Sequence, residues 1–312
     1  MLVVGTGKGY GKTILFGEHF VVYGLEGIPC ALGQITTAEV KKVFGEKGYE
    51  LIDNRPATRG YKEEKNGEYT ALISRILEFM QVKSKVQITL SGNLFAASGM
   101  GASAACAVAI ARAINEEFNM NWNDEQINKA AFEGETAGSG TPSGIDNTVA
   151  TYGGFLLFKK NLTGGTNKTE VIKIKKPIEI VLANSGKTAL TKEVVGDVKK
   201  LKEADPKKVE KIFKEYESLE QEAIVALKNY DLKKLGELMD KNHKLLQEIT
   251  VSCKELDELV TISKTAGAFG AKLTGTGRGG MMIALTPGKE LQETVAKAIE
   301  KAGYAATKTQ IG

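Results

Sequence analysis

The stretch S-G-M-G-A-S-A-A, residues 98–105, runs directly into C-A-V-A-I-A-R-A-I-N-E-E-F, residues 106–118. The second segment is rich in alanine and predicts a helix from about Ala102 to Phe118. The first segment places two glycines and several small side chains at the start of that helix. Free N–H groups and the helix dipole favour an anion there, and small side chains let the backbone approach a phosphate. A tight turn that only leads into a packed helix would look the same, so both interpretations stay open at this point.

The composition indicates a globular protein with enough apolar residues for a core. The chain has 312 residues, of which 42% are hydrophobic and 26% charged, and this length suits one large or two ordinary domains. The net charge is +4, but the lysines lie among acids, as in residues 198–222, which favours a solvated helix face over a nucleic-acid surface. The three cysteines lie far apart and predict buried thiols in a reducing compartment. We see no leader and no apolar run of membrane-spanning length, so we expect a cytoplasmic protein without a membrane or nucleic-acid partner.

The pattern of apolar residues predicts an α+β chain. Residues 1–48 look β-rich, with TILFG, FVVYG and TTAEVKKVF as expected strands, and the polar residues 49–70 predict an exposed loop or hairpin. Further strands are expected at 86–91, 151–158, 178–183 and in MMIALT. Further helices are expected at 71–79, 123–135, 255–266 and 289–302, with a helical pair from about Pro206. We place a domain boundary near residue 180, which gives domains 1–180 and 181–312.

Two other glycine-rich segments resemble nucleotide motifs but lack the required context. GTGKGYGKT, residues 5–13, ends like a P-loop, yet the first glycine of that motif would have to stand at Thr6. An extended run follows it rather than a helix. KLTGTGRGGMMIAL contains G-x-G-x-x-G at Gly275, Gly277 and Gly280, but a strand-like segment follows where a dinucleotide site needs a helix. Residues 98–105 therefore remain the best candidate for a phosphate site, with Ser103 as a hydroxyl that could bind magnesium.

Two acids follow this candidate site in the stretch GETAGSGTPSGIDN, residues 134–147. Glu135 ends a predicted helix, and Asp146 lies just past the rigid turn Pro142-Ser143-Gly144. Magnesium binds oxygen ligands, and phosphoryl transfer needs an acid or base near the acceptor hydroxyl. Ordinary loop carboxylates would give the same pattern, so the spacing alone does not decide between these roles.

Four segments, in this order and spacing, resemble the motifs of the superfamily that joins galactokinase, homoserine kinase, mevalonate kinase and phosphomevalonate kinase. They are KTILFGEHFVVYG, SGMGASAA, GTPSGIDNTVATYGG and KLTGTGRGG. Gly17-Glu18-His19 followed by VVYG, together with PSGIDN, resembles the mevalonate kinase family in particular. The resemblance implies a two-domain α+β fold, with a ribosomal-protein-like N-terminal half and a ferredoxin-like C-terminal half. It also implies ATP- and Mg²⁺-dependent phosphorylation of the primary hydroxyl of (R)-mevalonate, a small-molecule substrate, by a homodimer.

The resemblance also implies roles for individual residues. Asp146 would be the general base, with Lys12 beside it. The phosphate loop would comprise Ser98, Gly99, Met100, Gly101, Ala102 and Ser103. The magnesium ligands would be Ser103 and Glu135. The expected substrate contacts are Lys12, Glu18, His19, Ser143, Asp146 and Thr191. The third glycine motif, which backs the catalytic centre, would comprise Gly275, Gly277 and Gly279.

Three positions depart from the family pattern. Tyr10 replaces a proline, Ala102 replaces a serine of the phosphate loop, and Arg278 replaces a glycine. The Arg278 guanidinium could reach a phosphate or a carboxylate, or point to solvent, and we expect the latter. The alternative function is that of a sister kinase acting on phosphomevalonate or on a sugar or amino-acid alcohol. A non-catalytic metabolite-binding protein is the alternative of another class.

Overall fold

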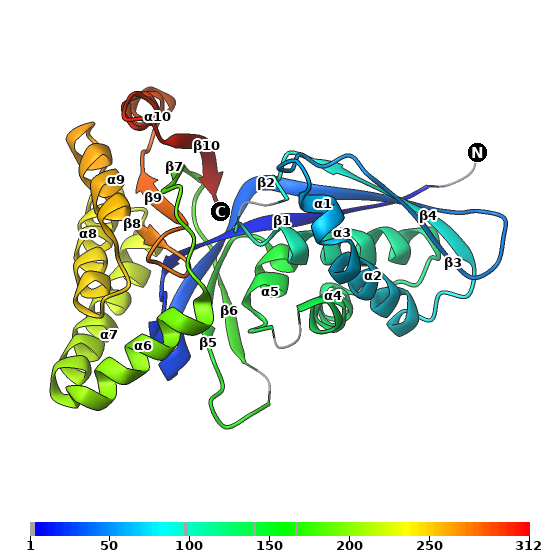
Figure 1. Cartoon of the computed structure of the whole chain (residues 1–312), viewed down its shortest axis with the longest axis horizontal. Helices are drawn as coiled ribbons and strands as arrows, with labels where there is room; N and C mark the ends of the chain where they lie inside the picture. The colour runs from blue at the N-terminus through cyan, green and yellow to red at the C-terminus, as the bar shows by residue number, and fades with distance from the viewer. Residues whose placement is uncertain (1–3, 97–98, 140–141, 166) are drawn as a thin grey trace. The chain divides into compact units, whose positions relative to one another are not determined.

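The computed structural model describes residues 4–96, 99–139, 142–165 and 167–312 and divides the chain into two compact units. Unit 1 comprises Met1–Lys12 and Ala31–Gly153, and unit 2 comprises Thr13–Cys30 and Gly154–Gly312. Two paired strands, β1 (Gly5–Phe16) and β2 (Glu26–Lys42), contribute residues to both units (Figure 1). The division into domains 1–180 and 181–312 stays a prediction.

Unit 1 combines a sheet with a layer of helices. Its strands are ordered β3-β4-β2, with β1 beside β2. β3 (Gly48–Asp53) runs parallel to β4 (Lys85–Gly92), and β4 is antiparallel to β2. The helices of this unit are α1 (Tyr61–Glu64), α2 (Asn66–Phe79), α3 (Ala102–Glu117), α4 (Asp124–Ser139) and α5 (Ile145–Tyr152). α3 contacts α2, α4 and α5, and its buried alanines form the centre of this core.

β1 packs directly on α3 through alternate glycines. A Cβ atom at Gly5, Gly7 or Gly9 would lie 2.1–2.2 Å from a carbonyl oxygen of α3. These carbonyls belong, in turn, to Ala113, Ala109 and Ala105. Alternate residues of a strand share one face, and residues four apart share one face of a helix, so the glycine spacing matches the helix. GTGKGYGKT is therefore part of a strand that continues past Thr13, and the rejection of a P-loop is confirmed.

Unit 2 contains an antiparallel sheet in the order β10-β7-β9-β8. These strands are β7 (Ile178–Asn184), β8 (Gly270–Thr274), β9 (Met281–Leu285) and β10 (Ala305–Ile311). β5 (Phe155–Lys159) pairs with β6 (Lys168–Ile172) and with the start of β2. The helices are α6 (Thr191–Ala204), α7 (Pro206–Asn229), α8 (Leu232–Glu248), α9 (Lys254–Thr265) and α10 (Lys289–Lys301). Within this unit α8 and α9 pack against β8, and α10 packs against β7 and β10 (Figure 1).

Capping residues set the start of the predicted helical pair. The Asp205 carboxylate accepts a hydrogen bond from the N–H of Lys208, and Pro206 occupies the first turn of α7. Asp231 caps α8 in the same way through the N–H of Lys234. Both arrangements satisfy N–H groups that a helix leaves unbonded, so they favour a helix start at these positions.

Three expectations about local structure are wrong. Phe20–Tyr23 forms a 3-10 helix (η1) rather than a strand, because Gly17 and Gly24 bend the chain at φ values of 114° and 81°. Residues 49–70 are no simple loop, since they contain most of β3, all of α1 and the start of α2. Residues 151–152 end α5 instead of starting a strand, because Gly153 and Gly154 have φ values of 67° and 65° and separate helix from strand.

None of the helices in the described part of the chain combines the length and the apolar character that a membrane span needs.

Candidate active site

The N-terminus of α3 lies against β1 within unit 1. Gly101 is the N-cap of α3 at φ 70°, and Gly99 has a φ of 69°. The N–H of Lys12 donates to the carbonyl of Met100 at 2.7 Å, which fixes the loop to β1. The two left-handed glycines let the helix begin at Ala102, so the N–H groups of its first turn remain available for an anion. Ser98, the first residue of the predicted phosphate loop, lies outside the described residues.

A lysine and a carboxylate meet beside this loop. Lys12 Nζ, on β1, lies 2.9 Å from Oδ1 of Asp146, in the first turn of α5. Their side chains are 12% and 38% exposed, so the carboxylate faces solvent. A Cβ atom on Gly101 would lie 3.2 Å from Lys12 Cβ and 3.7 Å from Asp146 Oδ2. The helix N-terminus, a cation and a carboxylate are therefore in mutual contact.

Ser103, in the first turn of α3, and Glu135, on α4, form a second pair. The Ser103 hydroxyl donates to Glu135 Oε1 at 2.6 Å. Burial, together with the nearby Asp146 charge, raises the pKa of Glu135 to about 7, although Ser103 and Lys12 oppose the shift. A buried carboxylate beside a hydroxyl is stabilised by a cation, and both donor atoms are oxygens, as magnesium requires. The described residues contain no cluster of three or more His, Cys, Asp or Glu side chains that could hold a metal alone. A magnesium ion here would complete its shell with phosphate and water, which it normally does.

Ser143 lies in the turn that begins α5, next to Asp146. Its hydroxyl accepts a hydrogen bond from the N–H of Ile145 at 3.3 Å, and Gly144 caps the helix at φ 82°. The side chain is exposed. Ser143 therefore belongs with Lys12 and Asp146 in unit 1.

The other predicted substrate contacts lie together in unit 2. Glu18 forms an ion pair with Lys272 of β8, and both side chains are 0% exposed. His19 Nε2 lies 2.6 Å from the carbonyl of Thr276, and burial lowers the His19 pKa. The hydroxyls of Thr191 and Thr276 lie 2.8 Å apart. Glu18, His19 and Thr191 thus converge on β8 and the glycine-rich loop after it.

That loop is held by close backbone contacts. A Cβ atom on Gly277 would lie 2.1 Å from the Val251 carbonyl oxygen, a clash that only glycine avoids. The expectation that Arg278 points to solvent is wrong. Its Nη1 lies 2.6 Å from Asp197 Oδ2, and its Nε donates to the Thr250 carbonyl at 2.9 Å. The guanidinium therefore connects the loop to α6 and to Thr250, which follows α8.

Lys272, Thr274 and Thr276 also belong to this group of contacts, although their part in it is not predicted from the sequence. Each bonds to the segment 13–19: Lys272 to Glu18, Thr274 to Thr13 and Ile14, and Thr276 to His19. One signal was present in the sequence, because Lys272 is the only charged residue in the run G-A-F-G-A-K-L-T-G. A lysine in such a run is rarely buried without a partner.

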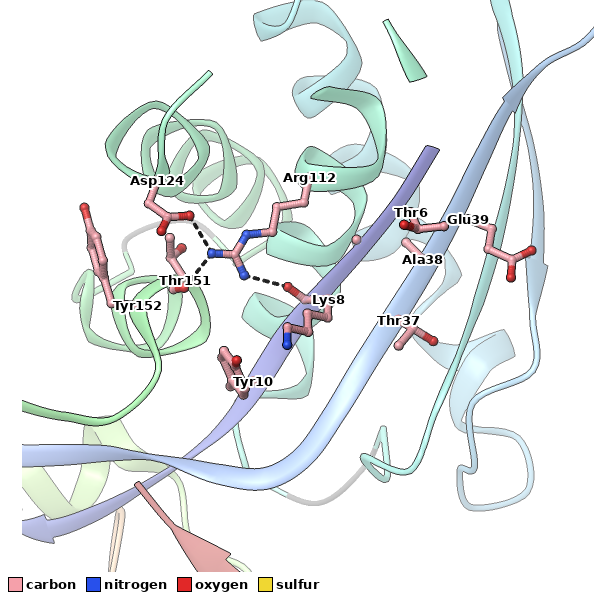
Figure 2. Close-up of a pocket in the computed structure, with 11 residues that line it drawn as sticks. Thr6, Lys8, Tyr10, Thr37, Ala38, Glu39, Arg112, Asp124, Thr151 and Tyr152 are labelled. Atoms are coloured by element: carbon pink, nitrogen blue, oxygen red, sulfur yellow. Dashed lines mark hydrogen bonds and ion pairs between the residues drawn. The ribbon is translucent and has the colours of Figure 1, made fainter. Parts of the chain in front are cut away.

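A separate cavity of about 720 Å³ lies in unit 1, beside β1, β2 and the end of α5 (Figure 2). Its polar lining includes Lys8, Glu39 and Arg112. Figure 2 shows the Arg112 guanidinium turned toward Asp124 Oδ1 and the carbonyls of Lys8 and Thr151, at 2.5, 2.9 and 2.7 Å. Because these acceptors already satisfy the guanidinium and Glu39 adds negative charge, this cavity suits a polyphosphate less well than the N-terminus of α3.

Tyr10, which replaces the proline of the first motif, also lines this cavity. Its ring packs over Gly153, where a Cβ atom would lie 3.1 Å from Tyr10 Cε2. The substitution therefore places an aromatic ring at the end of α5 and leaves Lys12 and Asp146 in contact.

Comparison with known proteins identifies the family of this chain. Residues 70–154 match the model for the GHMP kinases N terminal domain, and residues 223–305 match the model for the GHMP kinases C terminal domain. A mevalonate kinase from Thermococcus sibiricus is 36% identical, over 94% of this chain and 91% of that protein.

Two solved structures extend the similarity to the fold. The crystal structure of L. major mevalonate kinase in complex with R-mevalonate is 36% identical, covers 98% of this chain and 95% of that one, and superposes with a TM-score of 0.93. The Methanococcus jannaschii mevalonate kinase is 26% identical, covers 100% of this chain and 99% of that one, and has a TM-score of 0.81. These matches confirm the expected two-domain α+β kinase fold.

Proposed function

This chain belongs to the GHMP kinase family, and we propose that it transfers the γ-phosphoryl group of ATP to the primary hydroxyl of (R)-mevalonate. The product would be 5-phosphomevalonate. Full-length similarity to mevalonate kinases, one of them solved with R-mevalonate, supports this substrate over those of the sister kinases.

The contact of the Lys12–Asp146 pair with the N-terminus of α3 is the observation that carries this proposal. Kinases need a phosphate site and an acid or base beside it, and here both lie within one unit. Phosphoryl transfer involves little covalent chemistry by the protein, so this positioning supplies much of the catalysis.

Each group has a defined part in the proposed reaction. The amides of Gly99–Ser103 hold the β- and γ-phosphates and stabilise negative charge during transfer. Asp146 accepts or orients the proton of the mevalonate hydroxyl. Lys12 stabilises the ionised carboxylate and the alkoxide as it forms. His19, Ser143 and Thr191 remain proposed contacts of mevalonate.

Ser103 and Glu135 would bind Mg²⁺, because they present a hydroxyl and a buried carboxylate side by side. When bound, the ion neutralises charge on the phosphates. Replacement of Ser103 by Ala should raise the KM for magnesium-ATP about tenfold, through loss of one polar ligand, and leave the KM for mevalonate unchanged. An equal effect on both would mean that the phosphate site is misplaced. The homodimer and the cytoplasmic location stay predictions.

A parallel substrate assay tests the proposed function. ATP consumption would be measured with mevalonate, phosphomevalonate, galactose and homoserine, with and without a magnesium chelator. We expect kcat/KM for mevalonate to exceed the others by about a hundredfold or more. A higher value for another alcohol would establish the sister-kinase alternative. Binding of ATP without consumption on any of the four would favour a non-catalytic protein.

A further inference from the structure

The turn that carries Glu18 and His19 has an unusual backbone. Gly17 has a φ of 114°, and His19, although not a glycine, has a φ of 61°. Side chains rarely adopt this region, and such residues persist where the surroundings fix them. The cause of this conformation should therefore be visible in the contacts around the turn.

The Glu18–Lys272 ion pair is the charged contact of this turn. Both side chains are completely buried, and Lys272 Nζ also donates to the carbonyl of Leu273 at 2.8 Å. Burial lowers the pKa of Lys272, and the Glu18 charge opposes that shift. Since neither charged group reaches solvent, each depends on the other for compensation.

Further hydrogen bonds join residues 14–19 to β8 and the loop that follows it. The Thr274 hydroxyl donates to the Ile14 carbonyl at 2.9 Å and accepts from the Ile14 N–H at 3.1 Å. Because a carbonyl only accepts, His19 must donate its Nε2–H to the Thr276 carbonyl, which fixes the tautomer of the ring. The segment 14–19, which includes the turn, is thus attached to β8 and its loop at Lys272, Thr274 and Thr276, and the contact of Lys272 is the charged one.

We propose that Lys272 is a positioning residue, which holds Glu18 in the interior and thereby fixes the His19 imidazole for the phosphoryl acceptor. On this view Lys272 acts through Glu18, and Glu18 does not touch the substrate, in contrast to the role that the family resemblance implies. The part that concerns the acceptor rests on the proposed function.

Kinetics of Lys272→Met provide the first test. We expect the KM for mevalonate to rise by between about tenfold and a hundredfold, because a displaced contact group costs that much, while the KM for ATP stays within about twofold. Lys264→Met is the matched control. Lys264 also pairs with one carboxylate, Asp240, at 2.7 Å and donates to one carbonyl, Phe269, at 2.8 Å, but it is 35% exposed. The control should leave the KM for mevalonate unchanged.

The double variant Glu18→Gln/Lys272→Met distinguishes a positioning role from a purely stabilising one. It also carries no unpaired buried charge, so it can be measured even if Lys272→Met fails to fold. If the two residues act as one unit, the KM for mevalonate in the double variant should equal that of either single variant. Effects that multiply would show that Glu18 and Lys272 act independently and would overturn the proposal. A KM that returns to the wild-type value would show that the pair only stabilises the fold, which would overturn it as well.

Imidazole ¹⁵N NMR gives a readout that does not depend on activity. The chain has only two histidines, His19 and His243, so the signals can be assigned by removing either one. Wild-type His19 should show a fixed Nε2–H tautomer, and folded Lys272→Met should show averaged or shifted His19 signals. Unchanged His19 signals would overturn the proposal. If the wild-type protein does not phosphorylate mevalonate, the proposed function fails, and this spectrum still decides whether Lys272 positions His19.

Discussion

Two lysine–carboxylate pairs, one in each unit, contain the same chemical groups in different surroundings. Lys12 and Asp146 are 12% and 38% exposed, whereas Lys272 and Glu18 are both 0% exposed. An exposed carboxylate can meet an alcohol, and its pairing contributes little to stability. A buried pair cannot touch a substrate. Removal of either partner, however, leaves the other charge buried with neither a partner nor solvent to compensate it, which destabilises the fold. Exposure, rather than residue type, therefore separates the proposed catalytic pair from the positioning pair.

Asp146→Asn should give the largest effect. We expect kcat to fall by about 10² to 10⁴, the contribution of a positioned general base, while nucleotide binding is retained. The free energy of unfolding should change by less than about 1 kcal/mol, because the pair is partly exposed. Steady-state kinetics, nucleotide titration and urea denaturation would measure the three quantities. Near-normal turnover would refute the role of Asp146.

Lys272→Met, unlike Asp146→Asn, should lower the free energy of unfolding substantially. Removal of one partner from a fully buried pair costs about 3–5 kcal/mol, which urea denaturation followed by circular dichroism would detect. The half-exposed control, Lys264→Met, should lose less than about 1 kcal/mol. Equal losses in the two variants would show that burial does not distinguish these lysines.

Glu220 extends the comparison to a buried carboxylate that forms no ion pair with any described residue. Its side chain lies on α7, and burial and the Glu26 charge raise its pKa from 4.5 to about 7. Between pH 4.5 and about 7 the folded state therefore binds more protons than the unfolded state. The contribution of Glu220 to the free energy of unfolding is thus fully present below pH 4.5 and is lost as the pH rises through about 7.

Glu220→Gln should consequently stabilise the protein at pH 8 by about 1–3 kcal/mol and have little effect near pH 5. Urea denaturation at the two pH values would measure this difference. Glu210→Gln, at an exposed position of the same helix, serves as the control and should change neither value. A variant that is less stable than wild type at pH 8 would contradict the assigned cause.

Arg278→Gly should give the smallest effect. The Arg278–Asp197 pair is 32% and 38% exposed, and glycine relieves the φ of 51° at this position. We expect the free energy of unfolding to change by less than about 1 kcal/mol, and the KM for mevalonate to stay within about twofold. A tenfold rise in that KM would show that the guanidinium contacts the substrate.

Local patterns in the sequence predict most of the elements. The alanine-rich run predicts α3, apolar residues at helical spacing predict the pair α7 and α8, and the glycines at 99 and 101 mark the candidate phosphate site. The strand prediction for Phe20–Tyr23 fails because β-branched and aromatic residues suit strands, whereas two glycines with positive φ bend this segment into a short helix.

Contacts between distant residues are not encoded in such patterns. Glu18 and Lys272 are separated by 254 positions, and only the fold shows that they meet. The glycines of β1 are explained by the α3 carbonyls opposite them, which no local rule for turns or phosphate loops supplies. The proposed roles of Lys12 and Asp146 came from a family resemblance, while the structure contributes their 2.9 Å contact and its place beside Gly101.

A crystal structure with magnesium and ADP tests the central claim most directly. We predict that the terminal phosphate accepts hydrogen bonds from the amides of Gly99–Ser103, next to the Lys12–Asp146 pair. A polyphosphate bound in the Arg112 cavity, or at any site away from the start of α3, would contradict the account.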